Sequence, residues 1–119
     1  MRPDLTTYLG KTVTVTVDRP LGSTHPRYAD LIAYPINYGY LPNTISGDGQ
    51  PIDVYILGVE QAVEQFSGVI IAVVLREDDV EDKLVAAPAG RCYTAAEIVS
   101  ALSFQEQFFS SRVGLETKP

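Results

Sequence analysis

The chain has 119 residues, of which 45% are hydrophobic and 20% are charged, and its formal net charge at pH 7 is −6. This size and composition exclude a disordered chain and predict a single globular domain over residues 1–119. The negative charge argues against a nucleic-acid partner, because a phosphate backbone requires a basic surface. The longest apolar run, residues 69–75, is too short to cross a bilayer, so we expect no membrane partner either.

One cysteine and one histidine restrict the chemistry that the chain can perform. Cys92 has no partner for an internal disulfide and the first residues show no signal-peptide pattern, which together favour the reducing cytoplasm. We expect Cys92 to be a small buried residue and His25 to lie in a loop. A zinc site of His and Cys ligands is excluded, so a metal ion would bind through oxygen atoms, as Mg²⁺, Mn²⁺ and Ca²⁺ do.

Strand patterns occupy most of the chain before residue 90. The alternation of Thr and Val over residues 12–17 predicts a half-buried strand. Proline and glycine then predict a loop over residues 18–26 and divide residues 34–41 into short extended pieces. Three further runs predict strands, the second of which is buried on both faces: residues 54–58, 69–75 and 83–88.

A helix is predicted near the C-terminal end. Thr94 and Glu97 form a capping box, in which each side chain accepts a hydrogen bond from the other residue's backbone N–H group. Ile98, Leu102 and Phe109 form an apolar stripe, and Gly114 is expected to end the helix. Strands followed by one helix predict a mainly β, α+β fold: a small β-barrel with one C-terminal helix packed against it.

Two acidic runs are candidate metal sites. The first, SGDGQPID, contains Asp48 and Asp53; the second, EDDVED over residues 77–82, directly precedes Lys83. Carboxylates from two loops provide the oxygen ligands that Mg²⁺ requires, and a lysine beside them can hold a phosphate oxygen. Each run also has a purely structural interpretation: a turn in which an aspartate bonds its own backbone, and a solvated acidic hairpin. The nearby Tyr34, Tyr38 and Tyr40 equally suit a core.

In combination, these motifs resemble the family I soluble inorganic pyrophosphatases. The segment YPINYG is similar to the family's Tyr-Pro-x-Asn-Tyr-Gly segment, and DGQPID is similar to its Asp-x-Asp-Pro-x-Asp signature. Flanking similarities extend over residues 13–116: the loop DRPLGSTHPRY, the acidic loop and strand EDDVEDKLVAAP, and FQEQFF followed by GLE. The resemblance implies a five-stranded OB-like barrel that hydrolyses pyrophosphate to two phosphates through a metal-activated water, with Mg²⁺ as the cofactor and Mn²⁺ as an alternative.

The resemblance also implies roles for individual residues. The metal-ligand positions are Asp48, Asp53, Glu77 and Asp82. The phosphate-binding positions are Arg27, Tyr38, Lys83 and Arg112. Asp18 replaces a pocket glutamate, and the catalytic signature comprises Asp48, Gln50 and Asp53. A homo-oligomer is also expected, because pairing protects the exposed edges of a small barrel.

Several positions depart from the family pattern. Gln50 replaces the middle aspartate of the signature, which helps to activate water, and a glutamine cannot take a proton. Ala29 replaces another pocket glutamate, and residues 27–34 are too few for the family's arginine-bearing hairpin. Three hypotheses therefore remain: a metal-dependent pyrophosphatase, a weakened homologue that binds metal or a phosphorylated ligand, and an OB-like nucleic-acid binder, which the acidic charge opposes.

Overall fold

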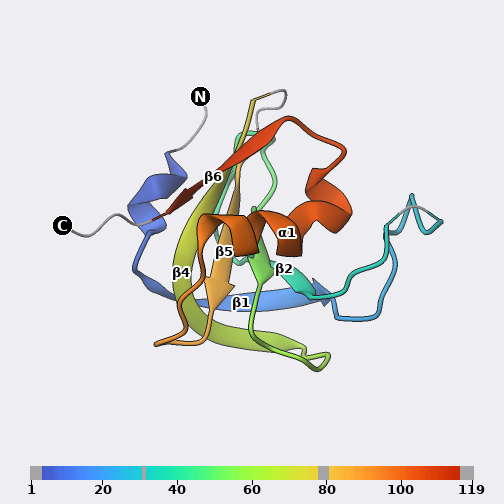
Figure 1. Ribbon diagram of the computed structural model, residues 1–119, viewed down its shortest axis with the longest axis horizontal. Coiled ribbons are helices and arrows are strands. Elements are labelled where there is room, and N and C mark those ends of the chain that lie inside the picture. The colour runs from blue at the N-terminus through green and yellow to red at the C-terminus, as the bar shows by residue number, and fades with distance from the viewer. Residues whose placement is uncertain (1–3, 31, 78–80, 116–119) are drawn as a thin grey trace.

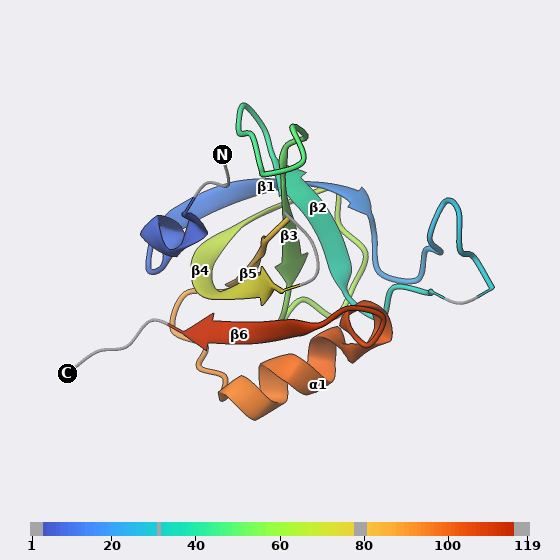
Figure 2. The same ribbon diagram turned by 90° about the horizontal axis from the view of Figure 1, so that it is seen from above.

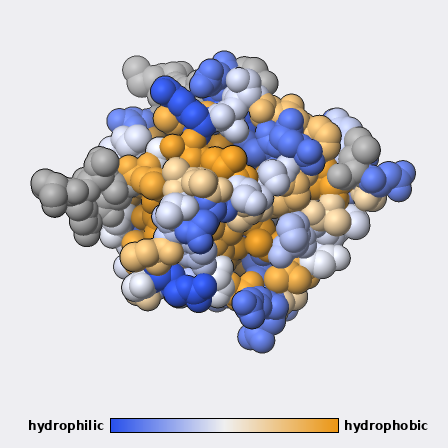
Figure 3. All heavy atoms as spheres, viewed as in Figure 1, coloured by the Kyte–Doolittle hydropathy of each residue, from blue (hydrophilic) through white to orange (hydrophobic). Residues whose placement is uncertain are grey.

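The computed structural model describes residues 4–30, 32–77 and 81–115. A short 3-10 helix, η1 (Leu5–Tyr8), precedes the first strand. The strands and the helix then follow in the order β1 (Thr12–Arg19), β2 (Asn37–Leu41), β3 (Ile52–Ile56), β4 (Gln65–Arg76), β5 (Lys83–Ala87), α1 (Ala95–Glu106) and β6 (Ser111–Leu115). Figure 1 shows α1 lying across the front of the strands. Apolar and polar side chains are interspersed on this face (Figure 3).

Five strands close into a barrel in the order β1-β2-β3-β5-β4, with β4 pairing back onto β1. All these pairs are antiparallel except β3 with β5. The long β4 makes the closure possible, because its first half pairs with β1 and its second half pairs with β5. This is the OB-like fold that the sequence predicts, with β6 added on β4 and α1 lying along β6 (Figure 2).

Gly39 allows the backbones of the paired strands β1 and β2 to approach closely. A Cβ atom at this position would lie 2.0 Å from the carbonyl oxygen of Thr16, which is backbone and cannot move aside. Only glycine fits such an approach. The glycine of the YPINYG segment therefore has a structural role in the barrel.

Alternation along the strands creates two apolar cores. Inward-facing residues such as Val54, Ile56 and Leu84 fill the barrel, together with Leu5 from η1. The intervening residues, such as Tyr55 and Val85, face outward and pack beneath α1. The outer core also contains Tyr34 and Tyr38 from the tyrosine-rich segment, as expected for core residues.

The predicted start of the helix is confirmed and its predicted end is wrong. Thr94 and Glu97 form the capping box, and Ile98 and Leu102 are buried. The helix ends at Glu106, however, and Gly114 lies in β6. Residues 111–115 pair antiparallel with residues 72–76 of β4, and this pairing outweighs the helical pattern.

Cys92 is exposed, so the expectation that it is buried is wrong, whereas His25 lies in a loop as predicted. In the described part of the chain, no helix combines the length and the apolar character that a membrane crossing requires.

Candidate active site

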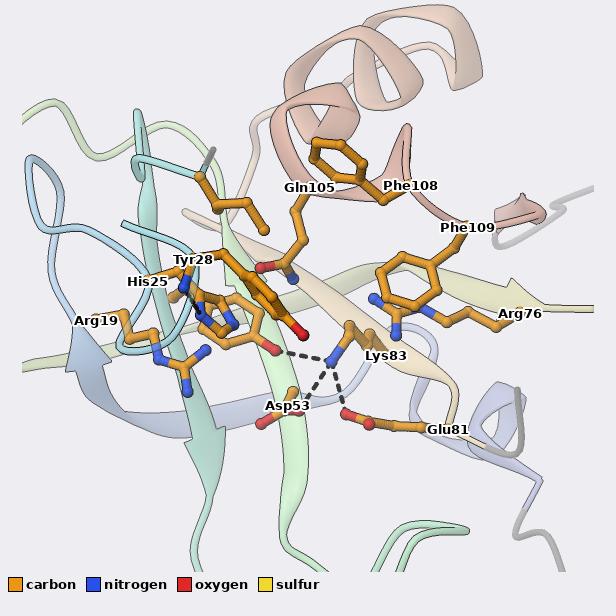
Figure 4. Close-up of a pocket in the computed structure, with 12 residues that line it drawn as sticks. Arg19, His25, Tyr28, Asp53, Arg76, Glu81, Lys83, Gln105, Phe108 and Phe109 are labelled. Atoms are coloured by element: carbon orange, nitrogen blue, oxygen red, sulfur yellow. Dashed lines mark hydrogen bonds and ion pairs between the residues drawn. The ribbon is translucent and has the colours of Figure 1, made fainter. Parts of the chain in front are cut away.

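Strand register brings three side chains together on the outer face of the barrel. Tyr38 pairs with Tyr55 across β2 and β3, and the parallel pairing of β3 with β5 places Lys83 beside Asp53. The Lys83 ammonium is buried and donates to Tyr38 Oη at 2.7 Å, to Asp53 Oδ2 at 2.8 Å and to Glu81 Oε1 at 2.6 Å (Figure 4). All three N–H donors of the lysine therefore have an acceptor.

The protonation of this cluster follows from burial and from its charges. Burial and a hydrogen bond with Asp53 raise the pKa of Glu81 to about 8. Burial alone would raise the pKa of Asp53 too, but the hydrogen bond from Glu81 and the charge of Lys83 lower it. At neutral pH the pair therefore carries one proton: Glu81 is protonated and Asp53 is ionised. Burial raises the pKa of Tyr38 well above its usual range, so this residue stays a neutral phenol.

An acidic cavity of about 310 Å³ opens on one side of Asp53. Its lining consists of Asp18, Arg19, Tyr40, Asp48, Gln50, Pro51, Asp53 and Glu81. Asp48 Oδ1 accepts hydrogen bonds from the Ser46 hydroxyl and, at 2.9 Å, from the Gln50 backbone N–H group. These bonds outweigh burial and lower the pKa of Asp48, whereas burial raises that of Asp18. The turn interpretation of this run is thus confirmed, and the same turn places Asp48 at the cavity.

A second cavity of about 440 Å³ lies on the other side of Asp53 and reaches α1. Its lining consists of Arg19, His25, Tyr28, Ile32, Tyr38, Asp53, Arg76, Glu81, Lys83, Gln105, Phe108 and Phe109 (Figure 4). The two cavities share Arg19, Asp53 and Glu81. We call the first the acidic cavity and the second the aromatic cavity.

Arg19 stands between the two cavities. Its guanidinium donates to Tyr34 Oη at 3.0 Å and lies 5.6 Å from the centre of the Tyr38 ring. Among residues 4–30, 32–77 and 81–115, no carboxylate forms an ion pair with Arg19. A guanidinium held in place without a carboxylate partner is well suited to bind an anion.

A chain of hydrogen bonds runs beneath the aromatic cavity. Tyr34 Oη donates to Gln105 Oε1 at 2.8 Å, and Gln105 Nε2 donates to Tyr55 Oη at 2.7 Å. Tyr55 in turn donates to Glu106, which also accepts from Arg76 Nη2 at 2.6 Å. The chain therefore connects Arg19, on one wall, with Arg76, on the opposite wall.

Six of the predicted site residues line these cavities: Asp18, Tyr38, Asp48, Gln50, Asp53 and Lys83. The other four line neither cavity: Arg27, Glu77, Asp82 and Arg112.

The side chains of these four residues have other surroundings. Asp82 is buried and accepts from the backbone N–H group of Arg76, and its neighbours in sequence face the opposite side, because side chains alternate along an extended chain. Glu77 and Arg112 are exposed and form an ion pair at 3.8 Å. Arg27 is exposed, and residues 78–80 of the second acidic run lie outside the described residues.

Sequence reasoning missed Glu81 and Arg19. Glu81 could have been found, because it precedes Lys83 by two residues and therefore shares its face. Arg19 could not, because an irregularity in the β1–β2 register between Val17 and Arg19 turns both Asp18 and Arg19 toward the site. The sequence predicts Phe109 on the helix stripe, but Phe108 and Phe109 both lie in the turn after α1.

The donor set of the acidic cavity suits a hard cation only in part. Within the described residues, no group of three His, Cys, Asp or Glu side chains is arranged to hold a metal ion. Asp53 and Glu81 are nevertheless adjacent oxygen donors, and the proton between them marks a place where positive charge is favourable. A divalent cation could replace that proton, with Asp48 on the same cavity wall.

Comparison with known proteins defines the family of this chain. The family model described as inorganic pyrophosphatase matches residues 11–117. The chain therefore belongs to the inorganic pyrophosphatase family, as the motifs in the sequence indicate.

Individual relatives carry the same name. An inorganic pyrophosphatase of Xylella fastidiosa (strain 9a5c) is 29% identical over 85 residues, which are 68% of this chain and 48% of the relative. An inorganic pyrophosphatase of Rickettsia felis is 31% identical over 81 residues, which are 65% of this chain and 43% of the relative. The chain thus matches about half the length, or less, of these relatives.

Solved structures support the fold. The inorganic pyrophosphatase of Ehrlichia chaffeensis matches with a TM-score of 0.68 at 19% identity, over 90% of this chain and 87% of that chain. The inorganic pyrophosphatase of Neisseria gonorrhoeae matches with a TM-score of 0.61 at 21% identity, over 96% of this chain and 88% of that chain. These similarities confirm the OB-like barrel.

Proposed function

We propose that the protein hydrolyses inorganic pyrophosphate to two phosphates with the help of divalent metal ions, of which Mg²⁺ is the first choice and Mn²⁺ the second. The observation that carries the proposal is the buried Lys83 ammonium, which donates hydrogen bonds to Tyr38, Asp53 and Glu81. These residues lie where the acidic cavity meets the aromatic cavity, whose lining includes Arg19, Arg76 and Lys83. The acidic cavity has the charge to hold a cation, and the aromatic cavity has the charge to hold a phosphate. Membership of the inorganic pyrophosphatase family supports this reading.

For the metal ion we propose Asp48, Asp53 and Glu81 as the ligands. Glu81 replaces Glu77 and Asp82 in this set, because it faces Asp53 and they do not. The metal would neutralise charge on the phosphate oxygens. The hard oxygen donors favour Mg²⁺ over softer metals.

For the substrate we propose Lys83, Tyr38 and Arg19 as the phosphate contacts. Arg19 takes the place that the sequence suggested for Arg27 and Arg112, since its guanidinium faces the cavities and is held by Tyr34. Asp48 and Asp53 hold the metal ion in this assignment, so the proton of the attacking water passes to solvent. Gln50 can orient that water but cannot accept its proton.

Phosphate release from pyrophosphate tests this function. We expect release only with Mg²⁺ or Mn²⁺, and we expect Lys83→Met to lower kcat/KM at least about 100-fold, as is typical of a lost charge contact to the transition state. Lys11→Met is the matched control, since Lys11 is exposed and outside both cavities. Equal rates for the two variants, with both folded in a thermal melt, would contradict the proposal.

The second candidate is a homologue that binds metal and a phosphorylated ligand without turnover, and Gln50 is the feature that favours it. Losing a general base typically costs about 10²–10⁴ in rate. Calorimetric binding of pyrophosphate without phosphate release would support this candidate. A gain of release in Gln50→Asp would then identify the missing proton acceptor.

The same proposal includes a single domain over residues 1–119 that forms a homo-oligomer in the cytoplasm and binds neither nucleic acid nor membrane. The net charge of −6 supports the exclusion of nucleic acid. Light scattering of the purified protein measures the oligomeric state. A filter-binding test at low salt checks the nucleic-acid claim, and retained oligonucleotide would contradict it.

A further inference from the structure

The aromatic cavity contains more apolar surface than pyrophosphate can use. Five large hydrophobic side chains of the described residues are exposed, and three of these line this one cavity: Tyr28, Phe108 and Phe109, which are 46%, 51% and 36% exposed. Grouped exposed apolar side chains beside polar ones mark a binding surface more often than chance placement does. Pyrophosphate has no apolar atoms to cover them.

Two of the three rings, those of Tyr28 and Phe109, contact a neighbouring side chain on the cavity walls. Figure 4 shows Arg19, His25 and Tyr28 on one side, and Phe108, Phe109 and Arg76 on the other. The Arg76 guanidinium lies 3.7 Å from the centre of the Phe109 ring, and the His25 and Tyr28 rings are 5.0 Å apart. Both walls therefore present aromatic rings to the cavity.

The charged end of the same cavity suits a phosphate group. Lys83 lies beside Asp53 and Glu81, and Arg19 lines the same cavity with its guanidinium hydrogen-bonded to Tyr34. The cavity volume of about 440 Å³ falls in the range of sites for small organic ligands. A ligand that fills the cavity thus has an anionic end and a flat apolar end.

We propose that the aromatic cavity binds a nucleoside diphosphate, with its phosphates at Arg19 and Lys83 and its base against Tyr28, Phe108 and Phe109. Such a molecule is pyrophosphate esterified at one end, so the charged end of the site need not differ from that for pyrophosphate. Any nucleobase can stack on an aromatic side chain, because every base has a flat π face.

The chemistry of this ligand rests on the proposed function. Water attacks the terminal phosphorus, the bond from that phosphorus to the bridging oxygen breaks, and a nucleoside monophosphate and inorganic phosphate leave. The proton released from the water passes to solvent. Binding of the ligand does not depend on this step.

Calorimetry with ADP and with pyrophosphate, both with Mg²⁺, tests the proposal. The wild-type protein is expected to bind ADP at least about tenfold more tightly than pyrophosphate, which is the scale of one base stacked on an aromatic ring. Phe108→Ser and Tyr28→Ser are expected to weaken ADP binding about tenfold and to leave pyrophosphate binding unchanged. Val99→Ser is the matched control, because Val99 is 53% exposed on α1 and lines neither cavity.

Three results overturn the proposal: ADP binding no tighter than pyrophosphate binding, equal losses for both ligands in the Phe108 and Tyr28 variants, or the same loss in the control. Calorimetry with isopentenyl diphosphate, an aliphatic diphosphate, is a further test. If this compound binds as tightly as ADP, the cavity accommodates an apolar chain instead of a base. Phosphate release from pyrophosphate in the same samples judges the proposed function separately. Release from pyrophosphate without tight ADP binding overturns this inference alone, and tight ADP binding without release overturns the proposed function alone.

Discussion

The interior of the barrel and the outer face beneath α1 differ in how they are built. The interior core consists of aliphatic residues such as Val54, Ile56 and Ile70, all fully buried. The outer face buries tyrosines with charged groups, among them Arg76, Lys83 and Glu106. Burying charge is costly and does not serve stability alone, whereas an aliphatic core does. The contrast supports a division in which the interior holds the fold together and the outer face contains the proposed site.

The largest expected effect concerns the close approach of β1 and β2 at Gly39, because the closed barrel includes this pair. Gly39→Ala would place a Cβ atom 2.0 Å from the Thr16 carbonyl oxygen, so we expect the barrel not to form. Gly114→Ala is the matched control, because its nearest neighbour would be 3.9 Å away. Circular dichroism and thermal melting measure both. A folded Gly39 variant with an unchanged melting temperature would contradict the close approach of the two strands.

Removing a charge from the outer face is expected to affect stability and binding together. Glu106→Gln breaks the buried ion pair with Arg76, which typically costs about 3 kcal/mol or more. It also alters the hydrogen-bond chain that reaches Arg19, so pyrophosphate affinity should fall as well. Denaturant unfolding and calorimetry measure the two effects, with the exposed Glu60→Gln as control. A loss of stability with unchanged affinity would mean that the chain does not position Arg19.

Truncating a side chain inside the barrel should lower stability and leave pyrophosphate affinity unchanged. Ile70→Ala removes a fully buried side chain and is expected to cost about 2–5 kcal/mol, whereas Ile45→Ala removes one that is 71% exposed and should cost little. Pyrophosphate affinity, measured where the variant remains folded, should match that of the wild type. A changed affinity would contradict the division between interior and outer face.

A smaller, pH-dependent effect is expected from Glu81. Its pKa in the folded protein is about 8, above the ordinary value of 4.5, so the protonated form is favoured on folding. The stabilisation is complete below pH 4.5 and is lost as the pH rises toward 8. In metal-free protein, the contribution of Glu81 to the free energy of unfolding should therefore decline over this interval. Glu81→Gln should flatten the decline, and an identical pH profile for the variant would contradict the shared proton.

Much of the fold was predictable from local pattern, and the site only in part. The alternation in β1 and the capping box at Thr94 each depend on neighbours in sequence, and both are confirmed. β6 was missed because its strand state depends on pairing with β4, far away in sequence. Phe109 continues the apolar spacing of Ile98 and Leu102, so periodicity alone places it on the helix stripe.

The site residues divide in the same way. Asp48, Asp53 and Lys83 belong to recognisable motifs and do line the cavities. Arg19 depends on a local irregularity of strand register, which sequence periodicity cannot reveal. Glu81 was accessible from alternation alone, because it lies two residues before Lys83.

The central claim is that pyrophosphate and its metal ions meet where the acidic and aromatic cavities join. A crystal structure with Mn²⁺ and imidodiphosphate, an analogue that resists hydrolysis, tests it most directly. We expect anomalous density for the metal beside Asp53 and Glu81, and phosphate density within hydrogen-bonding distance of Lys83 and Arg19. Metal or analogue bound instead at the exposed Glu77 and Arg112, with both cavities empty, would contradict the claim.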